Sequence, residues 1–157
     1  MGHGRYQAER LLALQQQQKL AQTERIELEG AARKNSHEFW EVLVSSVKGE
    51  VDEFVRNYPA ARYLRAEKVN ENNLTVETTV QPILRIEIIR YPGAYVQAHI
   101  MRQQQRAVEH SETLKFNFTA YGFSAGESSY TAEELASSLC KLVYDFFEQV
   151  SGTGSPS

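Results

Sequence analysis

The sequence contains a single cysteine and no long apolar segment. Cys140 alone cannot form an intramolecular disulfide, which favours a reducing compartment. Nowhere do about 18 consecutive apolar residues occur, as a membrane-spanning helix requires. The first ten residues also lack the apolar core of a signal peptide. We therefore expect a cytoplasmic protein that does not associate with a membrane.

Histidine is scarce as well, and charge of either sign shows little excess. The four histidines and the cysteine form no pair at metal-ligand spacing, so we predict no metal and no cofactor. The formal net charge is -3 and the pI is about 5.8. Such a chain has no long-range attraction to phosphate backbones, so protein partners are favoured over nucleic acid.

The length of 157 residues suits one domain with its own core. Changes in composition divide the chain into three parts. Residues 1–34 are predicted to form an N-terminal helical arm, and residues 35–150 an α+β domain. Residues 151–157 contain only serine, glycine, threonine and proline, which predicts a flexible tail.

The arm is rich in helix-forming residues and contains no proline. An apolar stripe follows a heptad spacing but is interrupted by Gln18 and Arg25. The stripe consists of Leu11, Leu14, Ala21 and Leu28. Its broken pattern predicts an interaction helix that contacts a second subunit or another protein with modest affinity.

Two amphipathic helices are predicted in the domain. Asn35 and Glu38 have the spacing of a capping box, so a helix should start there, bury Trp40 and end before Pro59. Thr131 and Glu134 form a second capping box, followed by an apolar stripe that continues to Val150. Both helices should cover a sheet.

Between these helices, apolar and polar residues alternate in five segments separated by turn residues. The pattern predicts an antiparallel meander of four or five strands, with Phe116 and Phe118 facing the core. The fold class is therefore a two-layer α+β domain with both helices on one sheet face. At the Pro92-Gly93 turn the sequence allows Ile89 or Ile88 opposite Val96, and core burial favours the second register.

The other sheet face should carry polar and aromatic side chains that combine hydrogen-bond donors, acceptors and tyrosines. These residues are Arg85, Glu87, Tyr95, Gln97, His99, Lys115, Asn117, Thr119 and Tyr121. Such a face could bind a small ligand or a peptide. An ordinary solvated sheet face explains the same pattern more simply.

The segment Gly122-Phe123-Ser124-Ala125-Gly126 matches the G-x-S-x-G nucleophile elbow of serine hydrolases. An elbow needs a strand, a sharp turn, a helix and a histidine later in the chain, yet no histidine follows Ser124. With a turn at residues 107–111, His99 would lie opposite Tyr121 and near Ser124. Glu77 or Glu87 would then have to orient that histidine. Coincidence is the simpler explanation of the motif.

The absence of a coherent catalytic set favours a non-enzymatic interaction or assembly module that acts through the arm. Ligand binding at the open sheet face and serine hydrolysis at Ser124 stay as alternatives. Since a broken stripe supports only modest affinity, we expect a homo-oligomer whose mass depends on concentration.

Overall fold

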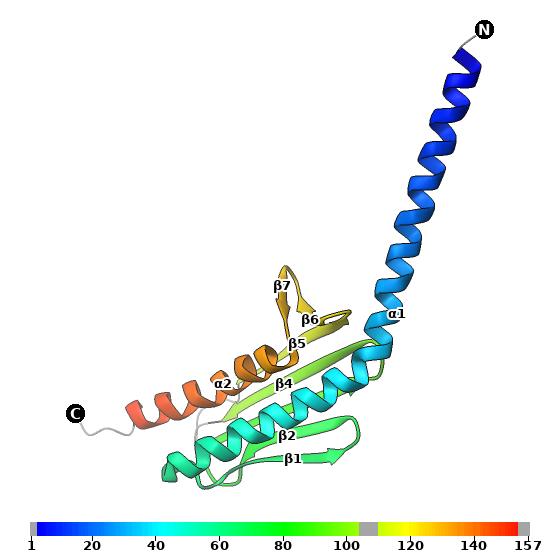
Figure 1. Ribbon diagram of the computed structural model, residues 1–157. Coiled ribbons are helices and arrows are strands. Elements are labelled where there is room, and N and C mark those ends of the chain that lie inside the picture. The colour runs from blue at the N-terminus through cyan, green and yellow to red at the C-terminus, as the bar shows by residue number, and fades with distance from the viewer. Residues whose placement is uncertain (1–2, 104–109, 154–157) are drawn as a thin grey trace.

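The computed structural model describes residues 3–103 and 110–153, which form an α+β fold (Figure 1). A long N-terminal helix and a C-terminal helix accompany one antiparallel sheet of seven strands. The strands follow one another in space in the order β1 to β7, so every neighbouring pair is also consecutive in the chain. The meander was predicted, but its strand number is higher than the expected four or five.

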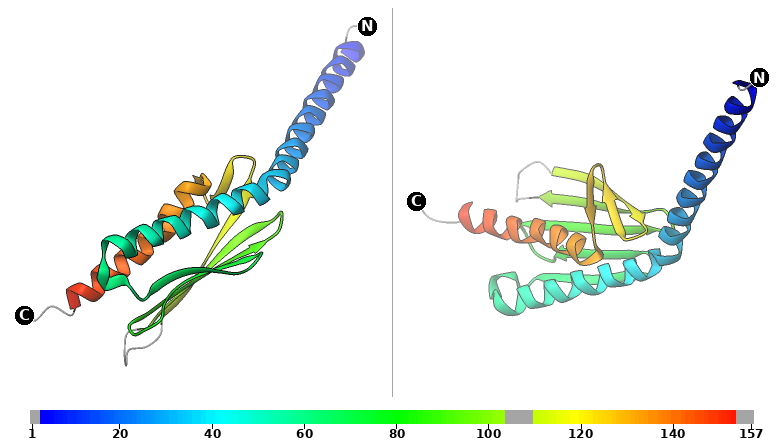
Figure 2. Two further views of the ribbon diagram at one scale, coloured as in Figure 1. Left: turned by 60° about the horizontal axis from the view of Figure 1, so that its bottom comes forward. Right: turned by 45° about the horizontal axis from the view of Figure 1, so that its top comes forward.

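The N-terminal helix, α1, runs without interruption from His3 to Asn57. The predicted helix start at Asn35 is therefore wrong. Residues 31–34 are strong helix formers and no proline or glycine interrupts residues 31–40, so the capping-box spacing of Asn35 and Glu38 falls inside a continuing helix. Figures 1 and 2 show that α1 bends between its free and its packed halves. The Ser36 hydroxyl donates to the Arg33 carbonyl at 2.9 Å, a contact that bends helices.

After α1, the short 3-10 helix η1 (Pro59–Ala61) leads into a hairpin of β1 (Leu64–Asn70) and β2 (Asn73–Thr78). The turn between these strands is closed by the Asn70 side chain, which accepts from the Asn72 backbone at 2.8 Å. This is the local bond expected where asparagines cluster.

Strands β3 (Ile83–Tyr91) and β4 (Tyr95–Gln103) are joined by three residues. Tyr91 pairs with Tyr95, and Arg90 pairs with Val96, so both registers considered for this turn are wrong. The expected match of apolar faces nevertheless holds, because an odd-numbered loop keeps Ile88 and Val96 on one face. Gly93 sits in the loop with a φ of +74°, a conformation that glycine adopts without strain.

Strand β5 (His110–Thr119) is followed by a second, unpredicted hairpin of β6 (Gly122–Ala125) and β7 (Ser128–Tyr130). Glycine has low strand propensity, and this hairpin was not among the five alternating segments of the predicted sheet. Gly122 lies so close to the Tyr130 carbonyl that a Cβ atom would collide with it. The predicted turn at residues 107–111 falls mostly on residues 104–109, which lie outside the described residues.

The C-terminal helix, α2, extends from Ala132 to Thr153. Its predicted capping box is confirmed: the Thr131 backbone donates to Glu134 and the Glu134 backbone donates to Thr131, both at 3.1 Å. The predicted tail is wrong for residues 151–153, which continue the helix. One glycine in a helix costs only about 1 kcal/mol relative to alanine, so Gly152 does not stop it. Residues 154–157 lie outside the described part.

The packed half of α1 and all of α2 cover one face of the sheet (Figure 2). The predicted burial of Trp40, Phe116 and Phe118 is confirmed, while Phe54 and Leu142 are only half-buried. The fully buried large side chains come from both layers, namely Trp40, Leu43, Val47, Val51, Leu74, Val76, Leu84, Ile86, Ile88, Ile100, Phe123 and Leu135.

The first prediction concerns Phe118, which is 7% exposed and packs on Phe123 with ring centroids 5.0 Å apart. Replacing Phe118 with alanine should lower the free energy of unfolding by about 3–5 kcal/mol, because it leaves a cavity in the core. Chemical denaturation followed by circular dichroism measures this. Tyr121 lies exposed in the turn between β5 and β6, so Tyr121→Ala should change the free energy of unfolding by less than about 0.5 kcal/mol. Equal effects of the two substitutions would contradict the packing described.

Candidate functional site

The first half of α1 projects from the body (Figure 1), and from here on the term arm refers to its exposed residues 4–30, a part of the predicted arm of residues 1–34. Every side chain of the arm is exposed. At 1.5 Å per residue the arm is about 40 Å long. Seven large apolar side chains on it are between 46% and 68% exposed, namely Tyr6, Leu11, Leu12, Leu14, Leu20, Ile26 and Leu28. The arm thus presents apolar surface that the described body does not cover.

The four residues of the predicted stripe all lie on the arm. Helical periodicity places Leu11, Leu14, Ala21 and Leu28 on one side of α1. Sequence reasoning gave no role to Leu12 and Ile26, which the same periodicity places on the opposite side. Their signal was visible in the sequence as isolated leucine and isoleucine residues, but they do not fit the heptad spacing.

Two adjoining open hollows of about 510 and 320 Å³ lie where the arm meets the turn between β5 and β6. Leu28, Ala120 and Tyr121 line both of them. Tyr121 is 82% exposed, so its ring stands beside the arm without being covered. No local pattern in the sequence indicates these hollows, because Leu28 and Ala120 lie 92 positions apart in the chain.

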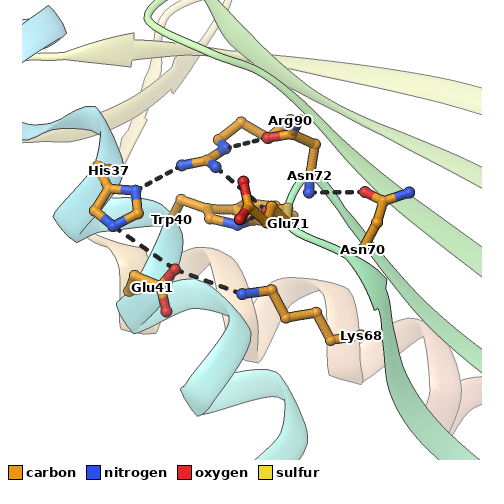
Figure 3. Close-up of polar contacts among 8 residues, drawn as sticks. All are labelled: His37, Trp40, Glu41, Lys68, Asn70, Glu71, Asn72 and Arg90. Atoms are coloured by element: carbon orange, nitrogen blue, oxygen red, sulfur yellow. Dashed lines mark hydrogen bonds and ion pairs between the residues drawn. The ribbon is translucent and has the colours of Figure 1, made fainter.

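Ten residues beyond the arm, the side chain of Trp40 connects α1 to the sheet. Its indole is fully buried, and Nε1 donates to the Glu71 carbonyl at 2.9 Å (Figure 3). Glu71 belongs to the turn between β1 and β2. This bond satisfies the polar atom of a buried indole and fixes the first hairpin against α1.

The guanidinium of Arg90, from the end of β3, completes this connection (Figure 3). It donates to the Asn72 side chain at 2.9 Å and to the Glu71 carbonyl at 3.3 Å. Its carbon lies 5.4 Å from the centre of the Trp40 ring, within range of a cation–π interaction. We call Trp40, Glu71, Asn72 and Arg90, together with His37, Glu41 and Lys68, the junction cluster.

His37 and Glu41 extend the junction cluster along α1. Arg90 Nη1 lies 2.9 Å from His37 Nδ1, and since a guanidinium can only donate, Nδ1 accepts. The ring hydrogen is then on Nε2, which faces Glu41 Oε1 at 3.9 Å. Lys68 Nζ lies 3.6 Å from the same oxygen. The junction cluster therefore links α1, β1, the first turn and β3 through polar contacts.

The predicted open-face residues lie where their strands were expected. The registers place them on the sheet face away from the helices, with Glu87 opposite His99, Gln97 opposite Lys115 and Tyr95 opposite Asn117. Arg85 and Thr119 lie on the same face by strand alternation. Tyr121 does not join them, because it lies in the turn beside the arm.

Many of these side chains are already engaged with one another. Arg85 contacts Glu87 at 2.8 Å and Glu77 at 3.9 Å, and Arg65 contacts Glu77 at 3.6 Å. Lys115 Nζ lies 4.3 Å above the Tyr95 ring. These contacts make a mutually paired polar surface, and they favour an ordinary solvated face over a prepared ligand site.

Ser124 lies within β6, with Asn117 opposite it on one side and Ser129 on the other. A hairpin therefore follows the serine, where a nucleophile elbow requires a sharp turn into a helix. The close approach of Gly122 to Tyr130 gives the first glycine of the motif a structural role. Small residues in a tight hairpin account for the motif.

The predicted position of His99 is wrong, because it pairs with Thr113 and not with a residue near Tyr121. The register differs because β5 begins at His110 and pairs from its first residues. His99 Nδ1 lies 2.8 Å from the Thr113 hydroxyl. Ser124 is aligned with Asn117 and Tyr95, four residues from His99 along β4, so the structure does not bring this histidine and this serine together.

Cys140 is 1% exposed between α2 and α1. Burial raises the pKa of the thiol well above its ordinary value. The nearby Glu50 carboxylate raises it further, through a hydrogen bond with the thiol and through its negative charge. Burial also raises the pKa of Tyr144 to about 12, with contributions from Cys140, Glu50 and Glu53. Glu50 is held by Ser137, whose hydroxyl donates to it at 3.1 Å. A protonated, buried thiol is inert, which indicates a structural cysteine.

In residues 3–103 and 110–153, no three histidine, cysteine, aspartate or glutamate side chains gather closely enough to hold a metal ion. Nor does the described part of the chain contain a helix with the length and apolar character needed to cross a membrane.

Comparison with known proteins adds no relative. No family model matches the chain, and neither a curated protein nor a solved structure shows significant similarity to it.

The junction cluster yields the second prediction. Arg90→Ala should lower the free energy of unfolding by about 1.5–3 kcal/mol, because it removes charge-assisted hydrogen bonds to Asn72 and Glu71. Arg90→Lys should recover little, since an ammonium cannot reproduce the planar fork. Arg65→Ala breaks an exposed ion pair and serves as control, with a loss below about 1 kcal/mol. Urea denaturation measures the free energy of unfolding of all three variants. If Arg90→Lys were as stable as the parent chain, the planar guanidinium would not be needed for the contacts to Asn72 and Glu71.

The third prediction concerns alkaline pH. Folding raises the pKa of Cys140 above 9.0 and that of Tyr144 from 10.0 to about 12. Above pH 9 the unfolded chain loses these protons first, so the folded chain binds more protons and its stability falls as pH rises. Urea denaturation between pH 8 and pH 11 should show a shallower decline for Cys140→Ala than for the parent chain. Parallel declines would show that this thiol does not contribute.

Proposed function

We propose that this chain is a non-enzymatic assembly module that associates through the apolar stripe of the arm. The observation that carries the proposal is the exposure of the whole arm, including seven large apolar side chains, on a helix that continues directly into the core. An isolated helix of this composition is marginal in water unless another surface packs on it. A partner that packs on the arm therefore supplies the apolar contacts that the body does not provide.

The alternatives receive less support. A ligand at the open sheet face would have to compete with the contacts among Arg85, Glu87 and Glu77. Hydrolysis at Ser124 would need a base, and His99 lies elsewhere on the sheet. We expect the module to act in the cytoplasm, to bind protein and not nucleic acid, and to form a homo-oligomer that dissociates on dilution.

The fourth prediction tests the stripe directly. Leu14→Ser with Leu28→Ser should weaken self-association at least about tenfold, because the assembly loses several apolar contacts. A tenfold change in the dissociation constant corresponds to a loss of only about 1.4 kcal/mol of binding free energy. The matched control is Leu12→Ser with Ile26→Ser, which removes equally exposed apolar side chains from the opposite side of the arm. Sedimentation velocity over a wide concentration range measures the dissociation constant of each form.

A shortened chain provides the second arm of that experiment. Removing residues 1–34 should leave a folded monomer, because the first buried side chain of α1 is Ser36. Unfolding of the shortened chain would make the arm part of the core. An unchanged, concentration-independent mass in the full chain and both variants would reject the proposed function.

A further inference from the structure

We propose that the partner of the arm is the arm of a second copy, that the two run antiparallel, and that Gly4 of each lies beside the hollows next to Tyr121 of the other. This inference rests on the proposed function, which already expects a homo-oligomer, and adds the orientation and register of the paired arms. Three features of the described residues support it: the distribution of charge along the arm, the position of two charges beside the stripe, and the hollows at its base.

The arm is electrically asymmetric along its length. Residues 4–20 carry three basic residues and one acidic residue, a net charge of +2, whereas residues 21–30 carry one basic and three acidic residues, a net charge of -2. In a parallel pair each half would face a half of the same sign. An antiparallel pair places the basic half of each arm against the acidic half of the other, and it also opposes the two helix dipoles.

Two of these charges flank the stripe in the same way. Arg10 directly precedes the stripe residue Leu11, and Glu24 directly precedes Arg25, which occupies the equivalent place two heptads later. Neither Arg10 nor Glu24 forms an ion pair with another described residue, whereas Arg5 and Arg25 are paired with Glu9 and Glu29.

Flanking charges of this kind set the orientation of paired helices. Antiparallel pairing brings residues on the same flank together, so Arg10 of each copy faces Glu24 of the other.

This pairing fixes the register. When Arg10 lies beside the other copy's Glu24, Leu11 lies beside its Ala21, and Gly4 reaches its Leu28. The first described turn of each arm then lies beside the hollows lined by Leu28, Ala120 and Tyr121 of the other copy, whose volumes are about 510 and 320 Å³.

The test uses disulfide formation between single-cysteine positions on the arm. The Leu11→Cys chain is mixed with the Ala21→Cys chain, oxidised under mild conditions and resolved without reductant. Native Cys140 is 1% exposed, and the parent chain controls for it. A covalent dimer in the mixture, with little in either variant alone, is the expected result. In a parallel in-register pair, each variant alone would cross-link because its own residues would meet.

The outcomes separate this inference from the proposed function. Cross-linking of the Leu11→Cys chain alone, with sedimentation still showing association through the stripe, overturns the antiparallel orientation and leaves the proposed function standing. Association without any cross-link also overturns the proposed arrangement. If the parent chain does not self-associate at any concentration, the second copy is not the partner and the proposed function fails with it.

A charge exchange supplies an independent measurement. Arg10→Glu and Glu24→Arg should each weaken association about tenfold, because each creates two like-charge contacts per dimer. The double substitution should return the affinity close to that of the parent chain, since it recreates both pairs with reversed sign. Affinities that fall additively in the double variant would contradict the pairing of Arg10 with Glu24.

Discussion

The hydrogen bond from the indole of Trp40 to the Glu71 carbonyl determines where α1 changes from an exposed rod into a wall of the core. Before this residue the helix has almost no buried side chain, and after it an apolar stripe packs on the sheet. Arg90 reinforces the bond from the opposite strand by contacting the same carbonyl and the face of the indole. Because the carbonyl belongs to a turn, the first hairpin and the helix cannot shift independently without losing these contacts.

The parts of the fold that follow from local pattern could be predicted. The alternation of Leu84 and Ile86, and of Phe116 and Phe118, assigns these side chains to one sheet face whatever the exact register. The reciprocal bonds of Thr131 and Glu134 need only four consecutive residues, so the start of α2 is also determined locally. Such features depend on short-range geometry, which the sequence displays directly.

The errors arose where local signals compete with longer structures. Asn35 and Glu38 have capping-box spacing, yet a helix already under way continues through them because extending it costs less than restarting it. The hairpin of β6 and β7 contains residues of low strand propensity and depends on pairing with β5, a contact that only the assembled sheet supplies. The same limit applies to the candidate site. Leu11 and Leu28 were visible as a stripe, whereas Tyr121 and Arg90 reach α1 only through the fold.

The continuity of α1 couples the arm to the sheet both in distance and in angle. Each residue added to an α-helix advances its tip by about 1.5 Å and turns it by about 100°, so an insertion between the arm and Trp40 would rotate the stripe around the axis as well as move it outward. Seven inserted residues complete nearly two turns and return the stripe close to its original azimuth, displaced by about 10 Å, whereas two or five residues point it away. Insertions of whole heptads therefore preserve the direction of the stripe, and evolution can lengthen the helix in heptads more readily than in single residues.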